Sequence, residues 1–202
     1  MTTDPTSGWE AAATAFLAAR SDIGAQIVTD WAITHLPAGA AILDVGAGTG
    51  KPIAVALAKA GFRPHAIDPS PSMIANFENT VPGAPARCEP VETSTFFGQR
   101  FDAAIAIGLI FLLTPRVQRL VIGRLGEALT PGGQLLFTAP AERWAWRDTL
   151  TGRVSVSLGK RAYDDLLSQA GFTAITHFTG DGGNHYFHAA GPALDAGVAD
   201  GS

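Results

Sequence analysis

Apolar and polar residues follow two different periods along this chain. Between residues 40 and 140, short apolar runs typical of buried strands alternate with segments whose apolar residues recur every three or four positions, as on a helix. This pattern predicts strands at about 41–46, 63–67, 85–89, 102–107 and 133–138, and helices at about 51–60, 71–78 and 115–129. Strands that alternate with helices predict a parallel sheet covered by helices on both faces.

The segments outside this central region complete a single predicted domain over residues 1–190. Apolar residues from Trp9 to Leu36 are spaced as on one or two amphipathic helices, which predicts a helical cap over residues 1–38. Residues 139–161 are too many for a plain connection, so we expect a functional insertion there. A helix near 162–170 and two further strands follow. The tail, residues 191–202, is small and polar and is predicted to be disordered.

Composition narrows the class of protein. The 202 residues are 47% hydrophobic and 16% charged, which is typical of one globular α/β domain. The 14 basic residues are outnumbered by 18 acidic ones and form no stripe, so nucleic acid is not an expected partner. The longest apolar run, 103–113, is shorter than the about 20 residues that cross a membrane. The N-terminus has no signal-peptide pattern, so we expect a cytoplasmic monomer or homodimer without a membrane partner.

Cysteine and histidine give no metal site. Cys88 is the only cysteine, which excludes an internal disulfide and zinc sites built from several cysteines. We expect Cys88 to be a small buried residue on a strand. His185 and His188 are an odd number of residues apart on a predicted strand, so they face opposite sides and cannot share a metal ion. The sequence therefore predicts no metal.

The most informative stretch is ILDVGAGTG, residues 42–50, where a buried strand runs into a glycine-rich turn and then a helix. Such a turn lets backbone N–H groups and the positive end of the helix approach a ligand. A phosphate-binding P-loop would need glycine at Val45 and a hydroxyl residue at Pro52. The dinucleotide pattern GxGxxG needs glycine or alanine at Lys51, so that alternative is weakened but stays open.

Including Asp44, ILDVGAGTG resembles the first motif of the class I S-adenosylmethionine (SAM) methyltransferases. The next strand, in FRPHAIDPSPSMIANF, ends at Asp68, and later segments up to LTPGGQLLFTAP continue the resemblance over about residues 40–140. The resemblance implies a doubly wound, mostly parallel α/β sheet of seven strands whose last strand is antiparallel. It implies SAM as cofactor and S-adenosylhomocysteine (SAH) as product.

The resemblance also implies a set of cofactor contacts. An acid at the tip of the second strand can accept both ribose hydroxyls, which is the expected role of Asp68. Arg20, in the cap, is the candidate for the methionine carboxylate. Members of the family often carry an adenine-binding acid where this chain has Pro90, so the Val91 backbone and Glu92 are the expected substitutes. The full set of expected cofactor residues is Trp9, Arg20, Asp44, Gly46, Ala47, Gly48, Gly50, Asp68, Pro69, Met73, Val91, Glu92 and Ile107.

The acceptor side is less defined. The fourth strand ends in AIAIGLIFLL without an acid, Asn or His, which disfavours an exocyclic nucleobase amine as acceptor. Residues placed at the same edge by the insertion and by the last turn are Trp144, Trp146, Asp148 and Asn184. His185 is the candidate general base because its pKa lies near working pH, although a structural hydrogen bond would also explain it.

We therefore expect a SAM-dependent methyltransferase that transfers a methyl group to an O, N or S nucleophile of a small molecule. Two alternatives stay open: a SAM-binding sensor or partner subunit without catalysis, and a dinucleotide-dependent oxidoreductase.

Overall fold

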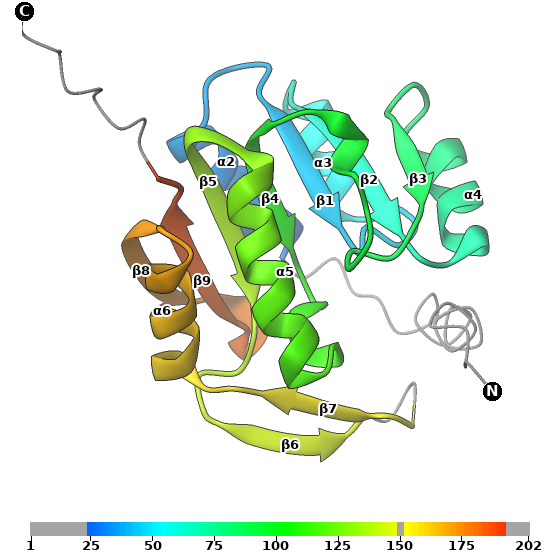
Figure 1. Cartoon of the computed structure of the whole chain (residues 1–202). Helices are drawn as coiled ribbons and strands as arrows, with labels where there is room; N and C mark the ends of the chain where they lie inside the picture. Colours follow the sequence, from blue (N-terminus) through cyan, green and yellow to red (C-terminus); the bar gives the residue numbers. More distant parts are fainter. Residues whose placement is uncertain (1–23, 149–151, 193–202) are drawn as a thin grey trace, which may run out of the picture.

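A seven-stranded sheet forms the centre of the computed structural model, which describes residues 24–148 and 152–192 (Figure 1). The strand order is β3-β2-β1-β4-β5-β9-β8. The strands of this sheet are β1 (Ala41–Val45), β2 (Arg63–Asp68), β3 (Ala86–Cys88), β4 (Phe101–Ala106), β5 (Leu129–Thr138), β8 (Thr173–Thr179) and β9 (His185–Ala190).

All pairings from β3 to β5 are parallel, and β9 is antiparallel to both of its neighbours, β5 and β8. The predicted mostly parallel sheet with an antiparallel last strand is thus confirmed. Successive strands step outward from β1 to β3, and the chain then crosses back to β4 on the other side of β1. This reversal between β1 and β4 is the topological switch point, where open α/β sheets bind ligands.

Helices cover both faces of the sheet. They are α2 (Ala25–His35), α3 (Ile53–Lys59), α4 (Pro71–Thr80), α5 (Pro115–Ala128) and α6 (Lys160–Gln169). Short 3-10 helices within the described ranges are η1 (Phe96–Gly98), η2 (Ile110–Leu112) and η3 (Asp181–Gly183). In Figure 1, α5 and α6 lie in front of the sheet, and α2 and α3 lie behind it. The main predicted helices and strands are present, with ends shifted by a few residues.

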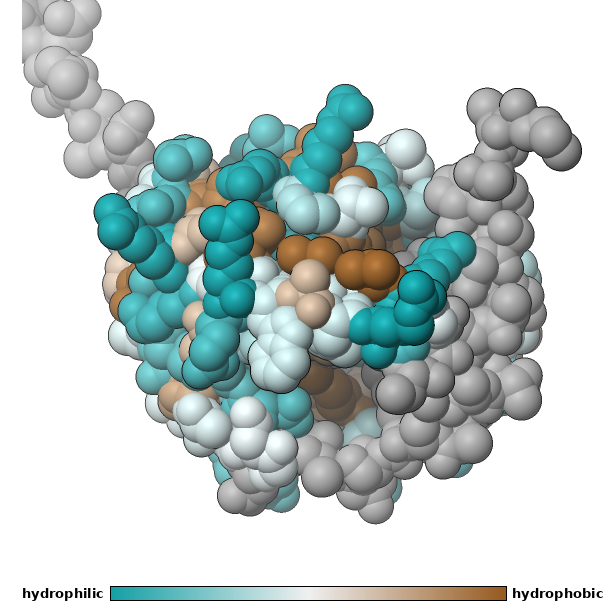
Figure 2. All heavy atoms as spheres, turned by 90° about the horizontal axis from the view of Figure 1, so that it is seen from below, coloured by the Kyte–Doolittle hydropathy of each residue, from teal (hydrophilic) through white to brown (hydrophobic). Residues whose placement is uncertain are grey.

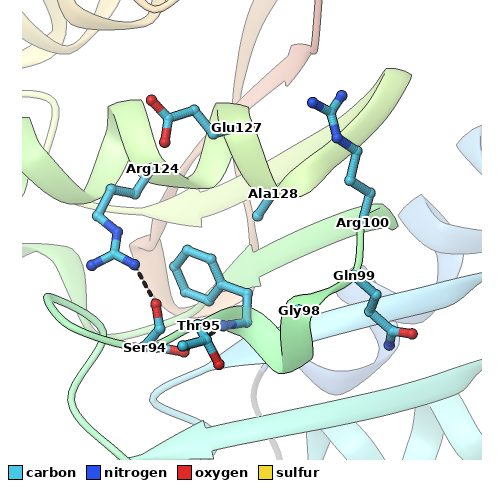
Figure 3. Close-up of a pocket in the computed structure, with 9 residues that line it drawn as sticks. Ser94, Thr95, Gly98, Gln99, Arg100, Arg124, Glu127 and Ala128 are labelled. Carbon is cyan, nitrogen blue, oxygen red and sulfur yellow. Dashed lines mark hydrogen bonds between the residues drawn. The ribbon is translucent and has the colours of Figure 1, made fainter.

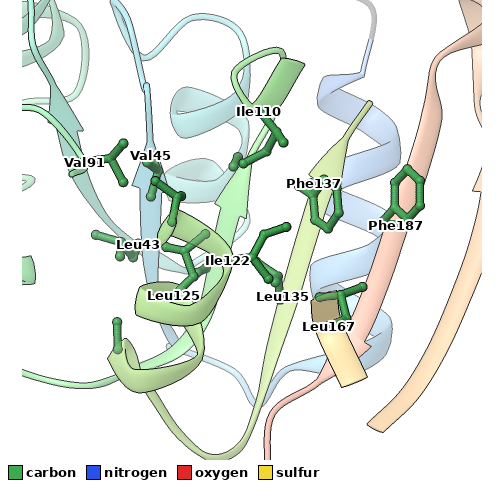
Figure 4. Packing of buried hydrophobic residues seen from close by; sticks show 14 of the residues in the cluster. Leu43, Val45, Val91, Ile110, Ile122, Leu125, Leu135, Phe137, Leu167 and Phe187 are labelled. Carbon is green, nitrogen blue, oxygen red and sulfur yellow. The ribbon is translucent and has the colours of Figure 1, made fainter. Parts of the chain in front are cut away.

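The alternation along β1 shows how the two faces are filled. Leu43 and Val45 pack toward α5 in one hydrophobic cluster, whereas Ile42 belongs to a second cluster with α2 and α3. Figure 4 shows Ile122 and Leu125 of α5 directed at the strands. Each such side chain contributes about 1.5 to 3 kcal/mol when fully buried. Every second residue of a buried strand therefore supports a different helix layer.

The predicted cap and the insertion are only partly described. The described cap helix, α2, buries Val28, Trp31 and Ala32. The insertion contains an antiparallel hairpin, β6 (Trp144–Arg147) and β7 (Val154–Ser157). The tail from residue 193 lies outside the described residues.

Cys88 corrects a prediction: its side chain is exposed. The physical reason is its strand, because β3 is a three-residue edge strand that pairs only with β2. Among the described residues, no helix is long and apolar enough to cross a membrane.

Candidate cofactor and acceptor site

Each of the five parallel strands ends in a loop at the same edge of the sheet, and hydrogen bonds join several of these loops to the neighbouring strand. The loop after β3 bonds to β2 through Glu89 N–H and the Asp68 carbonyl at 3.1 Å. The loop after β4 bonds to β5 through Gly108 N–H and Thr138 Oγ1 at 2.8 Å. Ala139 N–H, after β5, donates to the His185 carbonyl of β9 at 3.2 Å. Figure 2 looks onto this edge, where hydrophobic and hydrophilic side chains are mixed.

The glycine loop after β1 needs its glycines for two reasons. Gly46, Gly48 and Gly50 have φ values of 70°, 57° and 77°, a region that side chains disfavour. A Cβ on Gly50 would also lie 2.8 Å from the Phe77 ring of α4, and one on Gly46 would lie 3.2 Å from the Leu109 side chain. The loop is therefore pressed between α4 and the loop after β4. Asp44 and Ala47 beside it are buried.

Asp68, at the end of β2, is buried and faces the glycine loop. Its Oδ2 accepts the Gly48 N–H at 3.0 Å, and its Oδ1 accepts the Ser70 N–H at 2.9 Å. A carboxylate has about four lone-pair positions, so it can accept ligand hydroxyls as well as these two N–H groups. Asp68, which is predicted to bind the ribose, is thus held against Gly48 of the glycine loop.

The other predicted cofactor residues lie near the end of β2, after β3 and after β4. Pro69 is half-buried, and Met73, on the first turn of α4, is 8% exposed. Val91 packs into the cluster between the sheet and α5, whereas Glu92 is half-buried. Beyond β4, Ile107 is half-buried and packs with the α2 and α3 cluster. The predicted cofactor residues within the described range therefore come to one edge of the sheet.

The hairpin forms the wall of this edge beside β4. Trp146 lies against Phe111 of η2, with ring centroids 5.5 Å apart, whereas Trp144 is 63% exposed. Asp148, after β6, bonds through its N–H to the Arg153 carbonyl at 2.8 Å and thereby closes the hairpin. Of the two tryptophans, Trp146 is the one in contact with the loop after β4.

A buried polar network, which the sequence did not suggest, attaches the hairpin to this loop. Gln118 of α5 donates through Nε2 to the carbonyls of Leu113 and Val156, both at 2.8 Å. Its Oε1 accepts the Tyr163 hydroxyl at 2.7 Å, and that hydroxyl accepts the Leu158 N–H at 3.2 Å. Gln118 and Tyr163 are fully buried, and burial raises the pKa of Tyr163. The alternation of apolar and polar residues in VSVS is a sequence signal for β7. No sequence signal indicates that Gln118 and Tyr163 form the network.

His185 begins β9 at the same edge, on the α6 face. Its ring is stacked on His177 at 5.5 Å and lies edge-on to Phe187 at 4.9 Å. Burial, and next the neighbouring imidazole of His177, lower the pKa of His185 below its usual value. His185 Nε2 is buried and has no hydrogen-bond partner among the described residues. Asn184, the preceding residue, is exposed.

His188 lies on the other face, so the predicted opposite orientation of the two histidines is confirmed. It contacts His35 of α2, with ring centroids 4.3 Å apart. Within the described ranges there is no group of three or more metal-binding side chains. The predicted cofactor residues Trp9 and Arg20 lie outside the described residues.

The comparisons with known proteins agree with this geometry. Residues 42–133, from β1 into β5, match the family described as "Methyltransferase domain". The resemblance to the class I SAM-dependent methyltransferases that the sequence predicts is thereby confirmed. This match favours the methyltransferase expectation, with SAM as methyl donor, over the dinucleotide-dependent oxidoreductase. No curated protein matches the sequence.

Solved structures of methyltransferases share this fold at low sequence identity. A sugar N-methyltransferase, KedS8 from Streptoalloteichus sp., has a TM-score of 0.71 and 18% identity, with 89% of this chain and 92% of that chain covered. A Burkholderia thailandensis 1,6-didemethyltoxoflavin-N1-methyltransferase with bound SAH has a TM-score of 0.70 and 18% identity, over 95% and 92% of the two chains. CalS10, an amino pentose methyltransferase from Micromonospora echinaspora with bound SAM, has a TM-score of 0.69 and 20% identity, over 88% and 94%.

Proposed function

We propose that this protein transfers the methyl group of SAM to an O, N or S nucleophile of a small molecule. The observation that carries the proposal is the buried Asp68 carboxylate, which is held by two backbone N–H groups beside three left-handed glycines at the switch point of the sheet. A glycine turn and an acid at neighbouring strand ends are suited to a nucleoside that carries a polar substituent. The N–H groups of the turn can bind the substituent, and the acid can accept hydrogen bonds from the ribose hydroxyls.

In this proposal each loop has one task toward the cofactor. Asp68 accepts the ribose hydroxyls, and Pro69 and Met73 border the base together with Val91 and Glu92. The amino-acid part of SAM binds at the glycine loop, through Asp44, Gly46, Ala47, Gly48 and Gly50. Ile107 borders this part, and Trp9 and Arg20 of the predicted cap are assigned to it as well. When bound, SAM supplies an electrophilic methyl group on a sulfonium.

The acceptor side supports a small, partly apolar molecule. Phe111 and Trp146 offer an aromatic wall next to the predicted methyl position, and the loop after β4 has no acid, Asn or His. Positioning and exclusion of water can then supply much of the rate. The structural neighbours described as sugar N-methyltransferase and amino pentose methyltransferase act on small molecules, which favours the same acceptor size here. We assign Trp144, Trp146, Asp148 and Asn184 to the acceptor side.

His185 is our candidate general base. Because its pKa is lowered, the imidazole is neutral near pH 7 and able to accept a proton. Its Nε2 is enclosed by protein, so the proton would be accepted at Nδ1.

Thermal melting with SAH, and with NAD as control, tests the cofactor assignment. At about 100 times its dissociation constant, a ligand that binds only the folded state stabilises it by about 2.7 kcal/mol. For a chain of this length, that raises the melting midpoint by about 5 to 10 °C. A midpoint that rises with NAD and not with SAH would overturn the proposal.

A variant pair then tests the ribose site. Asp68→Ala should weaken SAH binding more than about tenfold, because hydrogen bonds to a charged group contribute about 1.5 to 3 kcal/mol. Asp68→Asn keeps an oxygen acceptor for one of the two backbone N–H groups and thus separates ligand binding from loop structure. Asp165→Ala, at an exposed site on α6, is the charge control. Wild-type SAH affinity in Asp68→Ala would remove the ribose assignment.

A further inference from the structure

The segment between β3 and β4 is held from the side by one arginine of α5. The guanidinium of Arg124 donates hydrogen bonds to the carbonyl oxygens of Glu92 and Ser94, and it lies over the Phe96 ring at 5.0 Å from the centroid. Figure 3 shows the bond from Arg124 to Ser94. Two carbonyls two residues apart are thus fixed by one planar group, which a guanidinium can do and a single ammonium cannot.

The same segment is closed by its own polar contacts. Ser94 is fully buried, and its N–H donates to the Pro90 carbonyl at 3.0 Å. Its hydroxyl donates to Glu89 Oε1 at 2.6 Å and accepts the Phe96 N–H at 2.9 Å. Phe96 and the next residue, Phe97, have φ values of 47° and 60°, a conformation that is costly for residues with side chains. Surrounding contacts must maintain this turn. Arg124 holds its Glu92 and Ser94 carbonyls, and Arg87 donates to Thr95 Oγ1 at 2.9 Å and lies over the Phe97 ring.

This turn begins beside the candidate ribose site. Glu89 N–H bonds to the Asp68 carbonyl, and β3 is the neighbour of β2 on the side away from the glycine loop. A nucleoside whose sugar lies at Asp68 and whose tail follows the glycine loop must therefore direct its base toward Pro90, Val91 and Glu92. Pro90 offers no side-chain acceptor and no N–H, so recognition of the base depends on where the main chain of Val91 and Glu92 lies.

We propose that Arg124 is a positioning residue for adenine recognition, which it controls by fixing the carbonyls of Glu92 and Ser94 without touching the cofactor. This inference rests on the proposed function, since it needs the nucleoside to occupy the Asp68 edge. Arg124 acts from outside the cofactor site: its accessible side lines a hollow of about 400 Å³ with Arg100 and Glu127, near the start of β4 and the end of α5.

The surroundings of Arg124 provide matched controls. Glu127 and Arg100 line the same hollow, and Arg100 bonds to the Leu129 carbonyl and not to the turn. Arg119 is an exposed arginine on the same helix. Substituting Glu127→Gln, Arg100→Ala or Arg119→Ala therefore changes the charge or the hollow but leaves the Glu92 and Ser94 carbonyls held.

The test measures binding of two ligands by calorimetry: SAH, and S-inosylhomocysteine, in which a carbonyl replaces the adenine amine. Wild-type protein should prefer SAH. In Arg124→Ala we expect SAH affinity to fall by about tenfold, the size expected from the loss of charged hydrogen bonds that order the turn. S-inosylhomocysteine affinity should change much less, so the preference is lost, and Arg124→Lys should lie between the two. The three control variants should keep wild-type values.

Each outcome has a definite meaning. Unchanged SAH affinity in Arg124→Ala, or an equal fall for both ligands, would overturn the positioning role, because a general loss of structure does not select one base. Melting curves and Arg124→Lys guard against a variant that fails to fold. Wild-type protein that binds neither ligand would instead overturn the proposed cofactor site, and the inference with it.

Discussion

Acid should destabilise this protein through His188, a histidine in the middle of β9. Its Nε2 lies 2.8 Å from Gln134 Oε1, and its Nδ1 lies 3.3 Å from Thr176 Oγ1, so both nitrogens have neutral partners. The side chain is 8% exposed and faces the His35 ring of α2. Burial, and next the charge of His35, lower the pKa of His188 from 6.5 to about 4.

The sign and size of the effect follow from this pKa. In the unfolded chain His188 takes up a proton near pH 6.5, whereas in the folded protein it stays neutral until about pH 4. The contribution of neutral His188 to the free energy of unfolding is therefore fully present above pH 6.5 and is lost progressively as pH falls toward 4. With 1.36 kcal/mol for each pKa unit, the free energy of unfolding should fall by about 2 kcal/mol between pH 7 and pH 5. The full difference, reached below pH 4, is about 3 kcal/mol.

Urea unfolding measures the contribution of His188 when it is done at pH 7 and pH 5 for the wild type and for His188→Gln. Glutamine cannot take up a proton, so the variant should lose about 2 kcal/mol less than the wild type over this range. His35→Gln should reduce the wild-type loss only in part, because burial is the larger cause of the lowered pKa. Equal pH dependence in the wild type and His188→Gln would refute the reasoning.

Three further predictions concern the site. Tyr163→Phe should lower the free energy of unfolding by about 1 to 3 kcal/mol, because Gln118 Oε1 and the Leu158 N–H lose their buried partner; a loss below about 0.5 kcal/mol would contradict the network. Gly50→Ala should destabilise more than Gly61→Ala, since both have positive φ but only a Cβ at Gly50 would clash; equal melting midpoints would exclude that crowding. His185→Ala should slow methyl transfer about 100-fold at unchanged SAH affinity, and wild-type turnover in this variant would remove His185 as the base.

The positions of the glycine loop and of Asp68 could be predicted from sequence because their determinants are local. The glycine turn follows its strand directly, and each of its three glycines has the left-handed φ that explains why glycine is present. Asp68 could be placed because β2 pairs with β1, so both strands end at one edge. Periodicity alone was enough to set the strands, their mostly parallel arrangement and the helices that cover them.

The prediction for Cys88 failed because periodicity does not say which strand lies at the edge of the sheet. An apolar pattern around a cysteine predicts burial only if something covers both faces, and β3 is short and has one neighbour. The hairpin was expected as an insertion but not as two strands. Its attachment could not be predicted, because Gln118 reaches Val156 across 38 residues and Tyr163 across 45.

The two halves of the edge therefore differ in what holds them. Around Asp68 and the glycine loop, hydrogen bonds from main-chain N–H groups to the Asp68 carboxylate determine the geometry. Beside β4, the position of the hairpin depends on the side chains of Gln118 and Tyr163 and on the contact of Trp146 with Phe111. Side chains can be replaced without changing the path of the sheet. The predicted acceptor wall can consequently vary while the path of the glycine loop stays the same, which is the kind of separation that lets one fold carry different functions.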